Sequence, residues 1–301
     1  MQMDYFLQQM MNALSIGGEY ALLALGLAMV FSVMGLVNFA HGELITVGGY
    51  SMFFAVLFFG VSNPLLILPI GVLAAVLFAV LLERVAFKPV RSAPPTTGML
   101  MAFGVSIIIQ NIALIFVGTR PKAVPTAQWL LQDVQLGTIR VPVVQILETS
   151  ITIAAIIMLV VFMRRTTIGL AMRAAAKDID TVRLMGIRAD RVVLAAFAIS
   201  GLLAGLAAVF IMARRGAVDP FMGFTPVLKA FVAAVVGGFG SLPGAVIGGF
   251  ALGIAEVTLQ ATLPAETAGF RDAFIFGAIG VLLLFRPQGI LGERPDFGEK
   301  S

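Results

Sequence analysis

Polar residues within or beside the apolar stretches of this chain are its clearest candidates for chemistry. Asn38, His41 and Glu43 follow the first apolar stretch, and Gln110 and Asn111 are adjacent within the fourth. An ionisable group at membrane depth usually serves function, whereas at an interface it is a solvated helix end, and the sequence leaves both open. For the two amides, the alternative is hydrogen bonding between helices. We predict that these residues are candidates for lining a translocation pathway.

Two further carboxylates, Glu19 and Glu256, lie deeper in apolar surroundings. A charged side chain that faces lipid at the centre of a bilayer costs roughly 2.5 kcal/mol or more. We therefore expect both carboxylates to face the interior of the protein or water, either paired or protonated. Together with Glu43 they could carry ion coupling if the chain were a self-contained secondary transporter.

A basic, polar segment at residues 164–191 separates two long apolar stretches, and it contains seven arginine and lysine residues against three aspartates. Gly169–Asp178 reads as a short amphipathic helix of good helix formers. Asp178 or Asp180 can cap a second helix, which Gly186 would end. Such charge also suits lipid headgroups, but a lipid-binding segment is more uniformly basic. The segment is predicted to be a structured cytoplasmic surface for a partner.

The elements that hold these residues belong in a membrane. The chain has 301 residues, of which 59% are hydrophobic and 12% charged, with a mean hydropathy of +1.02. Continuous apolar runs of about 18 residues or more indicate helices that span a bilayer. We predict an all-α polytopic membrane protein with one domain over residues 1–301, in which residues 164–191 form a coupling loop.

Nine stretches are predicted to cross the membrane, and they cover residues 10–35, 44–61, 64–83, 98–118, 146–163, 192–212, 226–238, 241–260 and 272–286. Basic residues favour the cytoplasmic side, which places the loops 84–97 and 164–191 and the tail (Arg294, Lys300) there, with the N-terminus outside. The 226–238 stretch is short and could instead be re-entrant, which would put the tail outside.

The predicted outer face has two notable features. Arg214 and Arg215 fall there in either version of the topology, which counts mildly against the orientation. The polar segment 119–146 is also expected there, with a strand-like piece at 138–142.

Glycines recur four residues apart near the C-terminus, which would place them on one helix face where another backbone can approach closely. The glycine-rich turn at 237–244 could also be a break that lets two half-helices move, and the two interpretations are compatible. A faint echo between 41–50 and 239–250 would fit an internal repeat, with chance similarity as the rival explanation. The glycines expected to have structural roles are Gly237, Gly238, Gly240, Gly244 and Gly248.

The sequence lacks the motifs of several protein classes. It has no cysteine and one histidine, which argues against thiol chemistry and a histidine-based zinc cluster. It also lacks G-x-x-x-x-G-K-[ST], H-E-x-x-H and G-x-S-x-G, the signals of nucleotide hydrolysis, metalloproteases and serine hydrolases. We expect no catalytic residues, no metal and no cofactor in this chain. Nucleic-acid binding is not expected either, because the basic residues follow positive-inside topology.

Six segments, taken together, form a specific pattern: Gly35–Glu43, Glu83–Arg91, Gly104–Asn111, Asp178–Ile187, Leu228–Ala245 and Arg286–Gly289. They resemble the signature segments of branched-chain amino acid ABC transporter permeases. The similarity covers nearly the whole chain, and it is closer to the shorter H-type subunit than to its M-type partner.

The resemblance implies an importer permease fold in the bacterial inner membrane, paired with a second, different permease subunit. It also implies two ATP-binding subunits, which bind ATP and magnesium, and a periplasmic protein that delivers leucine, isoleucine or valine. Relatives that handle urea, short amides or other amino acids share these motifs, so those solutes remain alternatives. The implied ATPase-docking loop contains Gly169, Arg173, Ala174, Asp178, Leu184, Gly186 and Ile187.

Overall fold

The structure, a computed structural model, describes residues 2–61, 63–91, 93–125, 127–137, 139–264 and 266–292 as a helical bundle with two small sheets. The bundle helices are α1 Gln2–Met34, α2 His41–Phe59, α3 Pro64–Leu82, α5 Pro95–Phe116, α6 Val143–Arg165, α9 Ala189–Arg215, α10 Phe224–Gly237, α11 Leu242–Thr262 and α12 Arg271–Phe285. The shorter elements are the π-helix η1 Glu83–Phe87, α4 Lys88–Val90, β1 Lys122–Ala123, η2 Gln128–Leu131, β2 Asp133–Leu136, β3 Ile139–Pro142, α7 Thr167–Ala175, α8 Ile179–Leu184, β4 Ala217–Val218 and η3 Ala268–Phe270.

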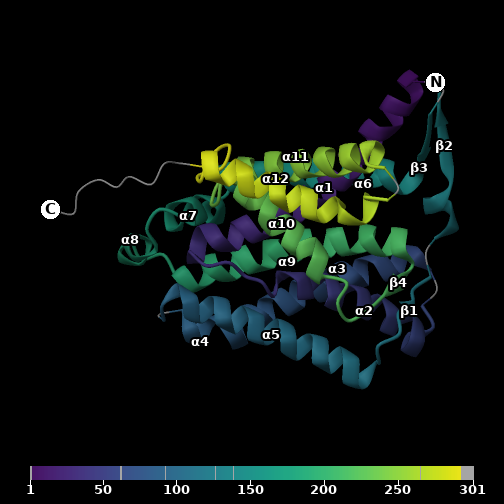
Figure 1. Ribbon diagram of the computed structural model, residues 1–301. Helices are drawn as coiled ribbons and strands as arrows, with labels where there is room; N and C mark the ends of the chain where they lie inside the picture. The colour runs from purple at the N-terminus through teal and green to yellow at the C-terminus, as the bar shows by residue number, and fades with distance from the viewer. Residues whose placement is uncertain are drawn as a thin grey trace.

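The two ends of the bundle differ in structure (Figure 1). At one, the loop end, α7 and α8 lie beyond the long helices. At the other, the strand end, lie the antiparallel hairpin β2–β3 and the antiparallel pair β1–β4. The β3 strand confirms the strand-like piece expected at 138–142, of which residue 138 lies outside the described residues.

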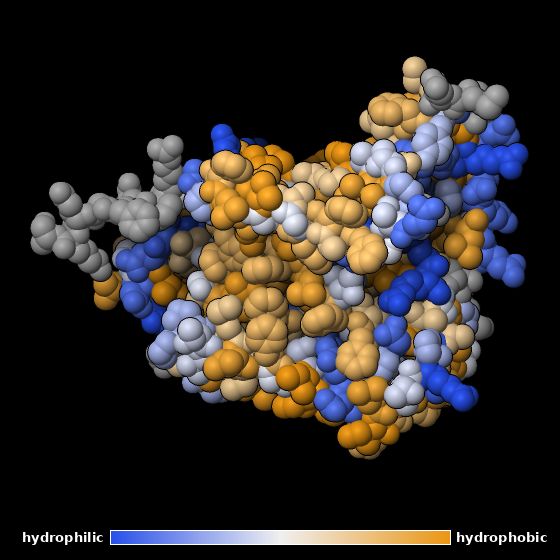
Figure 2. Space-filling view, in the orientation of Figure 1, coloured by the Kyte–Doolittle hydropathy of each residue, from blue (hydrophilic) through white to orange (hydrophobic). Residues whose placement is uncertain are grey.

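Eight of the described helical segments are long and apolar enough to cross a membrane, which confirms the all-α polytopic class. The remaining predicted crossing is α10, whose 14 residues are short for a bilayer. Nevertheless, α1 starts at the strand end and α12 finishes at the loop end, so the chain passes along the bundle an odd number of times (Figure 1). Eight long helices alone would give an even number, so α10 counts as a further pass. Figure 2 shows an apolar middle with most hydrophilic residues gathered at the two ends, as a membrane-spanning surface requires. The tail residues Arg294 and Lys300 lie outside the described residues.

The first helix is longer than predicted. It starts at Gln2 rather than at residue 10, because its first turns carry polar residues that hydropathy does not recognise as helix. The second helix begins at His41 rather than at residue 44, so the polar cluster of the sequence lies at a helix start.

The packing of the helices repeats with inverted direction. The first long helix, α1, packs against α11, as α9 packs against α3; likewise α2 packs on α3, as α10 packs on α11. In each half the long helix is followed by a connection, 35–40 or 216–223, and then by α2 or α10. This is the arrangement of an inverted repeat. The echo between 41–50 and 239–250 does not correspond to it, because the first begins α2 whereas the second covers a turn and the start of α11.

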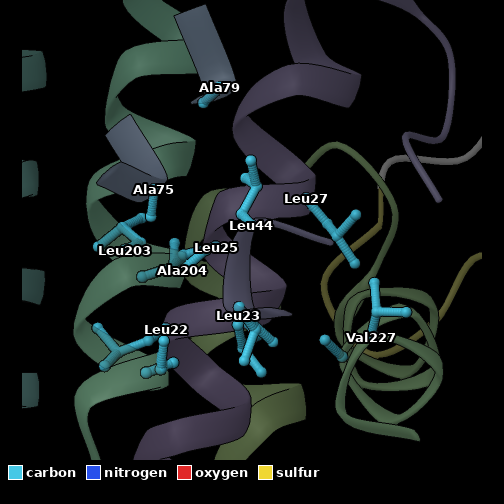
Figure 3. Close-up of a cluster of buried hydrophobic side chains, with 14 of the residues drawn as sticks. Leu22, Leu23, Leu25, Leu27, Leu44, Ala75, Ala79, Leu203, Ala204 and Val227 are labelled. Atoms are coloured by element: carbon cyan, nitrogen blue, oxygen red, sulfur yellow. The ribbon is translucent and has the colours of Figure 1, made fainter. Parts of the chain in front are cut away.

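The core forms around α1, whose leucines Leu22, Leu23, Leu25 and Leu27 meet side chains of α2, α3, α9 and α10 (Figure 3). Small residues at the helix contacts allow the backbones of neighbouring helices to approach closely. A Cβ at Gly248 would lie 1.9 Å from the Ala233 carbonyl oxygen of α10, so no side chain fits there.

The other predicted structural glycines lie at the turn between α10 and α11. Gly237 and Gly244 face each other, and a Cβ at either would come within 2.4 Å of the other's carbonyl oxygen. Gly240 is not on a helix face, contrary to the spacing argument, because it precedes α11 and adopts a φ of +87°. Gly238, with a φ of +112°, likewise ends α10 rather than packing within it.

Candidate functional site

The first polar group of the site sits inside the bundle because the 35–40 connection turns back from the end of α1. Leu36 packs against Gly98 near the start of α5. Phe39 then stacks on Phe103, further along α5, with ring centroids 4.4 Å apart. The connection therefore leads inward, and α2 begins at His41 partway through the bundle. Irregular backbone at membrane depth is tolerated where it is buried in protein or lines a water-filled cavity.

The start of α2 carries two polar contacts to neighbouring helices. His41 is fully buried, and its Nδ1 lies 3.0 Å from the Ser200 Oγ of α9. The carboxylate of Glu43 accepts hydrogen bonds from the Ser106 Oγ at 2.7 Å and the Gln110 Nε2 at 2.8 Å, both on α5. We call His41, Glu43, Ser106, Gln110 and Ser200, together with Asn38, the central polar cluster.

Several polar atoms in the central polar cluster have no protein partner. Both side-chain polar atoms of Asn38 are buried and unpaired, as are the His41 Nε2 and the Glu43 Oε2. Buried polar atoms are almost always hydrogen-bonded, so the cluster has capacity for a polar ligand or water. Asn111 does not take part, because its exposed amide donates to the Ile107 carbonyl on its own helix at 2.8 Å.

Sequence reasoning missed Ser106 and Ser200. The signal for Ser106 was available, because it lies four residues before Gln110 and so shares a face of α5. Ser200 carried no such signal, since its partner is 159 residues away in the sequence.

At the loop end, α7 and α8 form the second candidate site. Of the two predicted candidates, Asp178 rather than Asp180 caps α8, and its carboxylate accepts from the Asp180 and Thr181 backbone N–H groups at 2.9 and 3.1 Å. The hydrogen bond from the Thr181 hydroxyl, together with these two backbone bonds, lowers the pKa of Asp178. Gly186 follows α8 with a φ of +79°, as a helix-ending glycine should.

The surface of this loop is partly apolar. Leu184 and Met185 are 88% and 76% exposed, directly beside Gly186. Gly169 is buried instead, where a Cβ would lie 2.5 Å from the Phe162 carbonyl oxygen, so it allows α7 to fold back on α6. The other predicted docking residues, Arg173, Ala174, Asp178 and Ile187, are exposed.

The second basic loop lies at the same end and is tied to the first. The Asp190 carboxylate at the start of α9 accepts from the Arg91 Nη1 at 2.6 Å, and the Lys88 Nζ lies 3.2 Å from it. Arg91 also pairs with Glu83 of η1. The loops 84–97 and 164–191 therefore share one face of the protein, as the charge pattern predicted.

Two charged networks lie towards the strand end. In the first, Arg214 of α9 pairs with Glu19 of α1 and, at 2.5 Å, with Glu148 of α6, which also accepts from Ser15. These contacts connect three helices that each cross the bundle. They also account for Arg214, whose charge counted against the predicted orientation.

The second network surrounds Glu256 of α11. The Tyr20 hydroxyl donates to this carboxylate at 2.5 Å, and the Lys229 Nζ lies 2.8 Å from it. Arg271 and Asp272 of α12 extend the network at its edge. Glu19 and Glu256 thus face the protein interior and are paired, as their burial cost required.

Two cavities open on either side of the Glu19–Arg214 pair. One has a volume of about 560 Å³ and is lined mainly by uncharged residues of α1, α6 and α11. The other has a volume of about 580 Å³ and includes Asp219, Lys229 and Arg271. The strand end is therefore hollow and polar, whereas the central polar cluster is enclosed.

Replacing Arg214 with methionine is expected to lower the free energy of unfolding by about 3 kcal/mol, because Glu148 stays buried without its cation. Thermal unfolding of the protein in mild detergent measures this. The matched control is Arg215→Met, since the exposed Arg215–Asp219 pair should contribute less than about 1 kcal/mol. Adding Glu148→Gln to Arg214→Met should recover part of the loss, and a double variant no more stable than the single one would contradict this account.

An inverted repeat of membrane helices, a re-entrant connection leading to buried polar residues, and a structured loop at one end together define a membrane transport permease. The family described as the branched-chain amino acid transport system permease component matches residues 9–285. The chain belongs to this family.

Several curated relatives match this chain over nearly its whole length. The high-affinity branched-chain amino acid transport system permease protein LivH of Salmonella typhimurium is 37% identical, over 98% of both chains. The corresponding protein BraD of Pseudomonas aeruginosa is 35% identical over 97% of both. A xylose transport system permease protein, XylH of Escherichia coli, is 35% identical over 41% of this chain and 31% of its own length. The similarity to the H-type subunit is therefore confirmed, and the chain is a transport subunit rather than a catalytic enzyme.

Proposed function

We propose that this chain is the H-type permease subunit of an ATP-driven importer for leucine, isoleucine and valine in the bacterial inner membrane. The observation that carries the proposal is 37% identity to LivH over 98% of the chain, because that relative is named for high-affinity transport of branched-chain amino acids. Urea, short amides and other amino acids are the alternative solutes.

The importer is completed by a second permease subunit, two ATP-binding subunits and a periplasmic binding protein. ATP and magnesium belong to the ATP-binding subunits, since the sequence of this chain has no phosphate-binding loop of the Walker type. The support for docking is the exposed surface of α7 and α8, which presents both charge and apolar side chains at one end of the bundle.

The loop end faces the cytoplasm in this proposal. Both basic loops lie there, as the positive-inside rule requires. The N-terminus is then outside and the C-terminus inside, and the strand end faces the periplasm. Arg214 on the outer side does not count against this orientation, because two carboxylates compensate its positive charge.

The central polar cluster is proposed to line the translocation path halfway across the membrane. A zwitterionic amino acid needs polar partners there, because unpaired charge is costly in hydrocarbon. The helix N-terminus at the start of α2, which has no side-chain cap, favours a carboxylate, and Glu43 suits an ammonium group. The inverted repeat supports this location, since the α2 and α10 starts meet where Gly42 touches Gly223.

Reconstitution tests the class of transporter. Proteoliposomes with all five subunits should take up leucine only with binding protein outside and ATP inside, and without any ion gradient. Uptake by the purified chain alone, driven by protons or sodium, would contradict the proposal. The paired state of Glu19 and Glu256 favours the ATP-driven alternative, because both carboxylates are held by cations.

Gln110→Leu is expected to lower the maximal uptake rate about tenfold, corresponding to about 1.4 kcal/mol, because Glu43 loses a hydrogen-bond donor in the path. The neighbouring Asn111→Leu is the matched control, since its amide faces outward, and its uptake should stay within about twofold. Equal loss in both variants, or none in either, would remove Gln110 from the path.

A further inference from the structure

The first of the two strand-end cavities has the chemistry of a ligand site. We name it the outer chamber and define it by Asn12, Ser15, Glu19, Gln145, Arg214 and Gln260 among its lining residues. Its volume is about 560 Å³, and α1, α6, α9 and α11 all contribute to its wall. In the orientation proposed above, it lies on the side from which the substrate arrives.

The charges at the base of the outer chamber do not balance. Glu19 and Glu148 share a single guanidinium, that of Arg214. The other nearby cations are already used: Lys229 and Arg271 pair with Glu256 and Asp272, and Arg215 pairs with Asp219. One carboxylate charge in the first network therefore lacks a compensating cation among the described residues.

The hydrogen bonds show a matching lack of donors. Ser15 and Arg214 both bond to the Oε2 of Glu148, which leaves its Oε1 buried without a donor. One turn away, the Oε1 of Gln145 is also buried and unpaired, while its amide nitrogen donates to Asn12 at 3.1 Å. Both unpaired oxygens are acceptors, so the complementary group is a hydrogen-bond donor that carries positive charge.

A primary ammonium group meets both requirements, because it has three N–H donors and a unit charge. We propose that the outer chamber is a receiving site for the ammonium group of the incoming amino acid, with Glu19 and Glu148 as its counter-charges. Arg214 holds the two carboxylates together. Glu19 lines the chamber, whereas Glu148 is fully buried behind its wall and adds its charge from there. The inference rests on the proposed function for the direction of transport, but its chemistry can be tested separately.

A purely structural ion network would look different. It would be enclosed between helices on every side, with no member of the network on a cavity wall. Here Ser15, Glu19 and Arg214 instead form part of the wall of an open cavity. Paired charge on a cavity wall remains available to a ligand, whereas enclosed charge does not.

Thiol labelling of the assembled transporter in right-side-out vesicles tests the site. The natural chain has no cysteine, so Asn12→Cys places a single thiol of this subunit on the chamber wall. The cationic reagent 2-(trimethylammonium)ethyl methanethiosulfonate should react about tenfold faster than the anionic 2-sulfonatoethyl reagent, each corrected for its rate with a free thiol. In the Asn12→Cys, Glu19→Gln variant, which keeps the Arg214–Glu148 pair, this preference should disappear. Equal corrected rates in the Asn12→Cys protein would overturn the proposal.

Protection by small molecules identifies the ligand group. Leucine and 3-methylbutylamine, which share an ammonium group, should slow labelling at millimolar concentration, whereas 4-methylpentanoate should not. Protection by 4-methylpentanoate, or equal protection by sodium at matched ionic strength, would overturn the assignment to an ammonium group. ATP-driven uptake is measured on the same vesicles. Normal uptake with no charge preference removes the chamber proposal alone, while protection without ATP-driven uptake removes the proposed function alone.

Discussion

Leu184→Asp is expected to lower ATP-driven uptake by at least about tenfold in the assembled transporter, because in the proposed assembly it places a charge where an apolar side chain would meet the ATP-binding subunit. Leu184 is 88% exposed at the end of α8, and Met185 beside it is 76% exposed. Both lie on a loop that is otherwise rich in charge. Large apolar side chains exposed together on a water-facing loop indicate a surface that a partner covers.

The measurement compares uptake with ATPase activity in the same proteoliposomes. Stimulation of the ATPase by loaded binding protein should fall with uptake, while the yield of membrane-inserted chain stays normal. The matched control is Asp180→Asn, which removes only the exposed pair with Arg183 and should change uptake by less than about twofold. Full uptake by Leu184→Asp would exclude α8 from the docking surface.

Gly186→Val tests the same contact through the backbone. A β-branched residue is strained at a φ of +79°, at a cost of about 1–2 kcal/mol, so the Leu184–Met185 surface should shift. We expect reduced uptake in the same direction as for Leu184→Asp.

Local features of the loop end could be predicted from the sequence because they depend on neighbouring residues. The Asp178 cap and the Gly186 stop lie within a few residues of the groups they serve. The apolar stretches were likewise visible, since lipid as the solvent leaves few alternatives to a helix.

Contacts between distant segments could not be predicted in the same way. Arg214 meets Glu148 and Glu19 across 66 and 195 residues of sequence, so its position on the outer face appeared as a conflict. Glu148 itself was a missed signal, because it is an acid inside a predicted span and had to find a partner. The inverted repeat was also missed, since it is expressed in packing rather than in sequence similarity.

The central polar cluster combines residues that the sequence identifies with contacts that only the structure shows. Glu43 and Gln110 could be identified in the sequence as polar residues within or beside apolar stretches. Only the inward turn of the 35–40 connection, however, brings them together. Adjacent position in sequence gave Asn111 the same weight as Gln110. On a helix, however, consecutive residues point about 100° apart, and these two face different surroundings.

Gly248→Leu is expected to prevent stable packing of α10 against α11, at a cost of about 3 kcal/mol or more. A Cβ at this position would lie 1.9 Å from the Ala233 carbonyl oxygen, which is backbone and cannot rotate away. Because α10 pairs with α2 across the inverted repeat, its displacement should also disturb the central polar cluster. Size-exclusion chromatography in mild detergent should show loss of the monodisperse complex, together with a lowered Tm.

The control for this change is Gly277→Leu in α12, where an added Cβ would meet no heavy atom within 4 Å among the described residues and the new leucine would face outward. In lipid, an added leucine on an outward face costs little, because hydrocarbon surrounds it in either case. The two variants therefore separate helix packing from hydrophobicity and helix propensity. If Gly248→Leu and Gly277→Leu eluted alike and unfolded at the same temperature, close backbone approach could not be what holds α10 in place.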